Sequence, residues 1–225
     1  MVALLVITTF VAFILADAAV QWAGARQEDV RRRAFLAGAA VAGPATAPFP
    51  RGLFAAPGHT WVALEASGQV RIGMDAFAGS AIGRIDGVEL PEEGRRISRG
   101  DPLFTIHQGG RKAVFSAPVD GVVSAVNPEA RGEVAADPYR KGWICALDPA
   151  GLAAGLRRLL LGEEAVEWLR SEAKKYAELL TSRPLRTAEA GAVLADGGQV
   201  APGALEAVDD ETWNLFAAEF LGDRR

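Results

Sequence analysis

The stretch that decides the fold is residues 103–126, LFTIHQGGRKAVFSAPVDGVVSAV. Two β-type segments, Leu103–His107 and Lys112–Phe115, flank the pair Gly109-Gly110. Adjacent glycines readily adopt the positive φ angles that a two-residue turn requires, so this arrangement predicts a β-hairpin. A third segment of the same composition, Val119–Val126, follows directly and predicts another strand.

Short β-type segments continue on both sides of this hairpin, from residue 60 to residue 147. Turn residues separate them, and a short helix is expected over Asp75–Ser80. Many short strands at this spacing favour a small sandwich or barrel, so the chain is expected to be mainly β. The further strands are predicted at Trp61–Glu65, Val70–Met74, within Ile82–Leu90 and at Trp143–Leu147.

The pattern becomes helical after Pro149. Leucines recur at helical spacing, and a longer helix is predicted over Glu163–Leu180, with one apolar face that is expected to pack against the sheets. The leucines are Leu152, Leu156, Leu159 and Leu160, and the apolar face consists of Val166, Leu169, Ala173 and Tyr176.

The C-terminal part divides into an irregular linker, residues 181–207, and an amphipathic helix within residues 208–225. Trp213, Phe216 and Phe220 lie on one face of this helix, and acidic residues suit its N-terminus. Two interpretations stay open: the apolar face docks on a partner protein, or it folds back onto its own domain.

The N-terminal run at residues 2–25 is apolar except for Asp17 and is long enough to cross a bilayer, so it is interpreted as a membrane anchor. The arginines that follow favour a cytoplasmic location for the bulk of the protein. Two alternatives are a cleaved signal peptide and export through the twin-arginine-like segment at 32–36. Residues 26–57, basic and then rich in Pro, Ala and Gly, are expected to be a linker.

Composition excludes several kinds of function. The net charge of −4 argues against a nucleic-acid-binding surface, and the lone cysteine, Cys145, permits neither an intrachain disulfide nor a cysteine-rich zinc site. Only two histidines occur, so no metal site is expected. No nucleophile–base set and no phosphate-binding glycine loop is present, so the chain is not expected to be an enzyme.

Six pieces of residues 58–180 resemble the H protein of the glycine cleavage system, in the same order. The family's H-x-W-V, V-E-L-P-x-x-G, A-P-V-x-G and D-P-Y-x-x-G-W elements correspond to residues 59–62, 88–94, 117–121 and 137–143. Residues 70–78 resemble the family's next strand and short helix, and residues 163–176 its closing helix. Six residues match family positions and are expected to be structural: His59, Trp61, Pro118, Gly121, Gly142 and Trp143.

The resemblance implies a lipoyl-type flattened β-barrel with helices at its edge. It also implies a covalent carrier, in which a lysine at the tip of a hairpin holds lipoate. The family's lysine lies seven residues before the alanine of A-P-V, and this position is Gly110 here. The family's preceding glutamate aligns with His107. Glycine has no side-chain amine to which lipoate could be joined. The attachment position is therefore interpreted as lost, and no cofactor is expected.

Lys112 is the alternative attachment residue, since it lies two residues beyond the aligned position. Two other interpretations of Lys112 stay open. It forms a solvated basic pair with Arg111 beside the turn, or it belongs to a contact surface for another protein. The residues of that surface would be His107, Gly109, Arg111 and Lys112. The sequence therefore predicts a membrane-anchored, non-lipoylated docking or assembly subunit of a membrane-associated complex. The alternative is a lipoyl carrier, modified at Lys112, that shuttles a bound group between partner enzymes.

Overall fold

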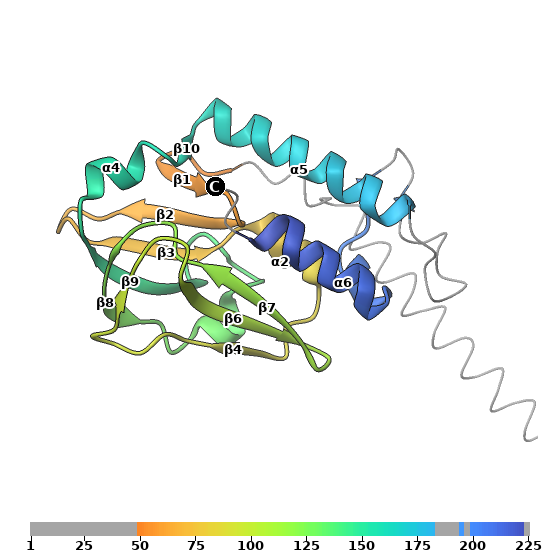
Figure 1. Ribbon diagram of the computed structural model, residues 1–225, viewed down its shortest axis with the longest axis horizontal. Helices are drawn as coiled ribbons and strands as arrows, with labels where there is room; N and C mark the ends of the chain where they lie inside the picture. The colour runs from red at the N-terminus through yellow and green to blue at the C-terminus, as the bar shows by residue number, and fades with distance from the viewer. Residues whose placement is uncertain (1–48, 183–193, 196–198, 223–225) are drawn as a thin grey trace, which may run out of the picture. The chain divides into compact units, whose positions relative to one another are not determined.

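The computed structural model describes residues 49–182, 194–195 and 199–222. Its larger sheet has seven strands, all paired antiparallel, in the order β10-β1-β2-β3-β9-β8-β5 (Figure 1). The strands are β1 (Leu53–Ala56), β2 (Thr60–Leu64), β3 (Val70–Met74), β5 (Arg96–Ile97), β8 (Gly121–Val126), β9 (Trp143–Pro149) and β10 (Leu160–Leu161).

A second sheet of three strands carries the hairpin, in the order β4-β6-β7. These strands are β4 (Gly87–Glu89), β6 (Pro102–Gln108) and β7 (Arg111–Ser116), so the predicted hairpin is confirmed. A separate antiparallel pair is formed by β11 (Leu194–Ala195) and β12 (Gln199–Val200).

Apolar residues of the two sheets meet in one core. Ile72 and Val62 of the larger sheet belong to the same buried cluster as Ile106 and Phe115 of the hairpin. Buried and exposed residues alternate along β7, as expected for a strand with one face on the core. Phe104 and Phe115 stack across the hairpin with their ring centroids 4.7 Å apart.

Helices flank the sheets. Asp75 and Asp209 each cap the helix that follows, by accepting a hydrogen bond from the backbone N–H three residues ahead, at 2.8 Å in both cases. The helices are α2 (Ala76–Ile82), α3 (Ala130–Glu133), α4 (Leu152–Leu156), α5 (Glu163–Thr181), the 3₁₀ turn η2 (Ala204–Glu206), α6 (Asp210–Phe216) and the π-helical segment η3 (Ala217–Leu221), which continues α6.

The mainly β architecture with C-terminal helices is confirmed, and three boundaries differ from the sequence prediction. The predicted linker to residue 57 overlaps β1, which pairs with β2. Leu160 is not helical, because β10 pairs with β1 at the edge of the sheet. The predicted linker at 181–207 contains η2, where Leu205 is fully buried. β10 and η2 pair or pack with residues distant in sequence, and β1 pairs with the distant β10 as well as with β2, so local composition did not reveal these segments.

The hydrophobic run at 2–25 lies outside the described residues. Within the described ranges, the structure contains no helix with the length and apolar character needed to span a bilayer.

Candidate functional site

The tip of the β6–β7 hairpin is the centre of the candidate site. Gly109 and Gly110 form a two-residue turn with φ angles of 53° and 87°, and the flanking residues Gln108 and Arg111 face each other. A Cβ atom placed on Gly110 would meet nothing within 4 Å. The position at which the family resemblance places a lysine is therefore open at the tip and lacks an amine.

Lys112 is the lysine nearest to the tip, directly opposite His107 in the hairpin register. Its side chain is 61% exposed and its Nζ atom lies 3.3 Å from Oε1 of Glu89 on β4. Nε2 of His107 lies 2.7 Å from the same oxygen. The hydrogen bond from His107, followed by that from Lys112, lowers the pKa of Glu89 below its usual value. Two of the predicted residues, Lys112 and His107, thus meet Glu89 on one face of the hairpin sheet.

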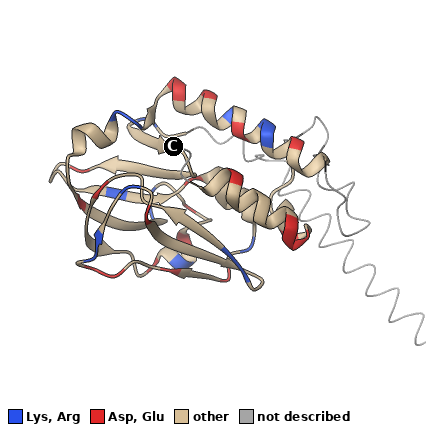
Figure 2. Ribbon diagram, in the orientation of Figure 1, with Lys and Arg blue, Asp and Glu red and all other residues tan. Residues whose placement is uncertain are grey.

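Arg111 points to the other side of the strand and is held by the C-terminal extension, which we define as residues 199–222. Its guanidinium forms an ion pair of 2.8 Å with Asp210 and donates to the carbonyl oxygens of Leu205 and Val208, at 3.1 and 2.7 Å. It also lies 5.4 Å from the centroid of the Trp213 ring. Figure 2 shows basic residues on β7 near the tip and acidic residues at the start of α6.

An open cavity of about 830 Å³ lies between the hairpin tip and the extension. The two glycines of the turn form one wall, and the extension supplies the opposite wall with Glu206, Asp210 and Asn214. The backbone of the turn is also held by Asp86, because the N–H of Gly109 donates to its carboxylate at 2.6 Å. This hydrogen bond is the main cause of a lowered pKa at Asp86.

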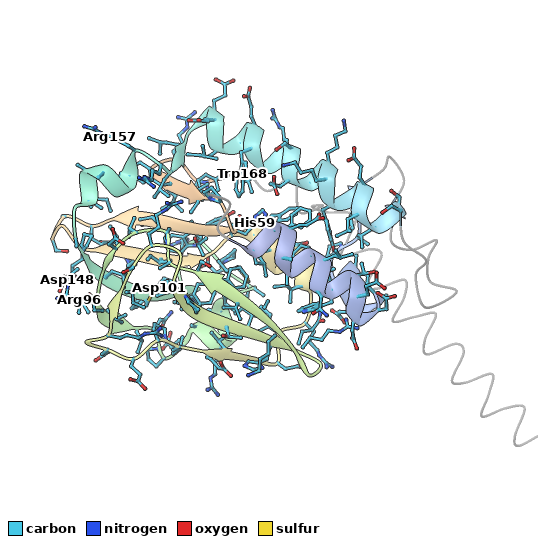
Figure 3. The ribbon with its side chains drawn as sticks, in the orientation of Figure 1. His59, Arg96, Asp101, Asp148, Arg157 and Trp168 are labelled. Atoms are coloured by element: carbon cyan, nitrogen blue, oxygen red, sulfur yellow. The ribbon has the colours of Figure 1, made fainter. Side chains whose placement is uncertain are left out.

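A second charged cluster is buried away from the tip, around His59. Its Nδ1 atom lies 2.8 Å from Asp75, and its Nε2 atom lies 3.9 Å from Glu172. The His59 ring stacks on the Phe77 ring, with the ring centroids 4.4 Å apart. Its centroid lies 4.9 Å from that of Trp168 on α5 (Figure 3). Burial alone would lower the pKa of His59, but the two carboxylates outweigh it and raise the pKa above its usual value.

The other family-matching residues serve packing. Trp61 is buried, and its Nε1 atom donates to the carbonyl oxygens of Met74 and Pro138, both at 3.0 Å. A Cβ on Gly121 or Gly142 would come within 2.6 or 2.7 Å of a neighbouring carbonyl oxygen, so both positions need glycine. Trp143 opens β9 and packs against the cluster of Trp61, while Pro118 is buried just before β8. Cys145 is buried, and burial raises the pKa of its thiol to about 12.

The C-terminal helix resolves the two interpretations that the sequence left open. Trp213, Phe216 and Phe220 are 2%, 0% and 2% exposed, and they pack into the core of their own domain. Of the two interpretations, the one in which these side chains form a partner-docking face is therefore wrong, because their apolar surface is already covered by their own domain. In the described part of the chain, no group of three or more His, Cys, Asp or Glu side chains is arranged to hold a metal ion.

Sequence reasoning missed the contribution of the extension to the hairpin. Asp210 lies 99 positions after Arg111 and Glu206 lies 122 positions after Arg84, so nothing local links them. The only signal in the sequence was the apolar face of the C-terminal helix. It indicated that the helix must be buried against something, but not that it packs beside the hairpin.

Comparisons with known proteins agree with the resemblance drawn from the motifs. Residues 54–172 match the family model described as glycine cleavage H-protein. A probable glycine cleavage system H protein of Thermococcus kodakarensis is 35% identical over 126 residues, which cover 53% of this chain and 91% of the relative. The glycine cleavage system H protein of Mycobacterium avium is 34% identical over 111 residues, covering 47% of this chain and 84% of the relative.

Among solved structures, the crystal structure of a glycine cleavage system H protein from Mycobacterium marinum is similar at 27% sequence identity. The similarity covers 53% of this chain and 98% of that chain, with a TM-score of 0.47.

Proposed function

Because the chain belongs to the glycine cleavage H-protein family, we propose that it is a non-catalytic carrier that presents a lipoyl group on the β6–β7 hairpin, with Lys112 as the attachment residue. Glycine cleavage H proteins carry lipoate on a lysine, and they serve an enzyme system without being catalytic themselves. Their partners are the other proteins of that system. The expectation that no cofactor is involved is therefore replaced by lipoate on Lys112.

The single observation that carries this proposal is the position of Lys112. The chain has four lysines, and the other three, Lys141, Lys174 and Lys175, lie outside the hairpin. The Lys112 amine is exposed, whereas Gly110 offers no group to which a carboxylic acid can be joined. Lipoate thus fits the residues at Lys112 and does not fit them at the tip itself.

The residues around Lys112 have defined tasks in this proposal. Glu89 holds the ammonium group on the exposed face, and His107 shares the same carboxylate oxygen. Attachment requires that Nζ lose a proton and form an amide bond with an activated carboxyl group, from which the activating group leaves. The bound group would supply the redox and transfer chemistry, while the hairpin holds the attachment point on a rigid strand.

A second candidate function is favoured by Gly110. A hairpin whose tip carries two glycines in place of a lysine suits a docking or assembly subunit that has lost the lipoyl group. The apolar run at 2–25 supports membrane attachment for either candidate, and the arginines after it support a cytoplasmic location of the domain. In this alternative the protein organises a membrane-associated complex and carries nothing.

Lipoylation of the purified full chain separates the two candidates. The protein would be incubated with a lipoate–protein ligase, lipoate and ATP, and its mass would be measured. The carrier proposal expects modification of the wild type and of Lys141→Arg, an exposed lysine that serves as the matched control, and none of Lys112→Arg. An unmodified wild type would favour the docking module, and modification of Lys112→Arg would exclude Lys112 as the site.

A further inference from the structure

The C-terminal extension lies beyond residues 54–172, which match the family, yet it is packed against the hairpin. Before it reaches the hairpin it contacts α2, where the N–H of Gly203 donates to the carbonyl oxygen of Ser80 at 2.7 Å. Glu206 then accepts from the backbone N–H of Arg84 at 2.8 Å. A Cβ on Gly83 would come within 2.5 Å of the Cα of Gly203, so the two backbones approach closely there.

Arg111 is the hairpin residue that binds the extension most extensively. It binds one carboxylate and two carbonyl oxygens of the extension and lies over the Trp213 ring. Only 18% of its side chain is exposed, whereas Asp210 is 76% exposed. Hydrogen bonds from a charged donor are stronger than neutral ones, and a guanidinium can satisfy several acceptors at once.

The extension also covers the free edge of β7. This strand is the outer strand of its sheet, in the order β4-β6-β7. Gln108 and Arg111 flank a two-residue turn and pair through hydrogen bonds, so the main chain of the next residue, Lys112, points away from β6. On this edge, Nε1 of Trp213 donates a hydrogen bond to the carbonyl oxygen of Lys112 at 3.4 Å.

Strand alternation places Lys112 on the face opposite to Arg111. Lys112 and Val114 are exposed there, while Ala113 and Phe115 are buried. The Lys112 amine is thus accessible on the face that carries Glu89 and His107, and the extension occupies the strand edge and the side of Arg111.

We propose that Arg111 is the positioning residue of the Lys112 site: by anchoring the extension, it closes the β7 edge and leaves Lys112 accessible from one face. An enzyme that transfers an acyl group to Lys112 then meets a rigid strand that offers a single direction of approach. This inference rests on the proposed function for the identity of the modification. The closure of the edge by Arg111 stands independently of it.

The test first compares three full-length proteins, the wild type, Arg111→Gln and Arg96→Gln, and then adds a fourth, Asp210→Asn. Arg96 is an exposed arginine on β5 and lies at the opposite end of the molecule from the hairpin tip (Figure 3), so it is the matched control. Hydrogen exchange would be measured by mass spectrometry in peptides from 111–116 and 199–222. We expect Arg111→Gln to exchange roughly tenfold faster or more in both peptides, and Arg96→Gln to match the wild type.

Two acylation reactions test the positioning role. An acetyl N-hydroxysuccinimide ester, a small reagent, should label Lys112 equally in all three proteins, because the amine is exposed in each. A lipoate–protein ligase should modify Arg111→Gln at least several-fold more slowly than the wild type. Asp210→Asn removes the ion pair alone and should give intermediate exchange and intermediate ligase rates, which guards against misfolding of Arg111→Gln.

The outcomes separate this inference from the proposed function. Unchanged exchange in Arg111→Gln would show that Arg111 does not hold the extension and would overturn the inference. Faster exchange with an unchanged ligase rate would overturn the positioning role. If the ligase modifies none of the proteins, the proposed function fails and the positioning role fails with it, while the exchange comparison still decides whether Arg111 closes the edge.

Discussion

The Nδ1 atom of His59 lies 2.8 Å from Oδ2 of Asp75, and both side chains are buried. Glu172 of α5 approaches the other ring nitrogen and is itself bound to Lys175 at 2.6 Å. The pair therefore ties the turn before β2 to two helices. A buried charge that loses its partner is strongly destabilising, so removing one member of this cluster is expected to lower the stability of the domain substantially.

Replacing Asp75 by Asn should lower the free energy of unfolding by about 3 kcal/mol or more. Asn caps a helix as well as Asp does, so the loss would report the missing charge beside His59 and not the cap of α2. Urea denaturation checks this. Asp148→Asn, at an exposed position on β9, is the control and should change stability by about 0.5 kcal/mol at most. Equal values for the two variants would refute the role of the buried pair.

Stability should also depend on pH in two windows. The pKa of His59 is raised in the folded state, so its contribution is complete below about 6.5 and is lost as pH rises through the folded value. For Glu172, burial raises the pKa, but the nearby His59 ring and the hydrogen bond from Lys175 outweigh it and lower the pKa to about 2. Its contribution is present above the usual value of 4.5 and is lost as pH falls towards 2.

Unfolding free energies measured from acidic to alkaline pH test both windows. His59→Gln should flatten the alkaline limb, and Glu172→Gln should flatten the acidic limb. An alkaline limb that is identical in the wild type and His59→Gln would contradict the assignment.

Two glycine substitutions should differ sharply. A Cβ on Gly73 would lie 2.6 Å from the buried Trp61 ring, so Gly73→Ala should cost about 3 kcal/mol. Gly110→Ala meets no atom and is opposed only by the positive φ angle, which costs about 1 kcal/mol. Thermal or urea denaturation of both variants gives the comparison. A larger loss at Gly110 would mean that the tip is packed and not open.

The extension should contribute to the core of the domain. Phe216 is fully buried and lies 5.5 Å from Tyr176 between ring centroids, so Phe216→Ala should cost about 3–5 kcal/mol. Leu64→Ala, at a side chain that is 48% exposed, serves as the control and should cost far less. If Phe216→Ala unfolded at the same urea concentration as the wild type, the extension would be a detachable segment.

Sequence reasoning predicted the elements that carry their own signal. Two β-type segments around a pair of glycines predicted the β6–β7 hairpin, and the apolar faces predicted α5 and α6. It missed β1, β5 and β10, because strands of two to four residues are defined by their partners and not by their composition. The family motifs marked His59 and Trp61, which are both buried, but gave no indication that two carboxylates flank the His59 ring.

The candidate site was predicted in part for the same reason. Gly110, Lys112 and His107 lie in one hairpin, so their proximity followed from the turn. The link from Arg111 to Asp210 and Trp213 joins segments separated by about a hundred residues, and such pairings depend on tertiary packing alone. The charge of Glu89 beside Lys112 likewise depends on the sheet order β4-β6-β7.

The most direct test of the carrier proposal is the mass of the Lys112-containing peptide, in protein purified from its own cells during growth with ample lipoate. The proposal predicts that a fraction of this peptide carries the added mass of an amide-linked lipoyl group on Lys112, while the peptides of Lys141 and Lys174 are unmodified. A Lys112 peptide that is unmodified in every copy would contradict the carrier proposal and favour the docking module as the alternative.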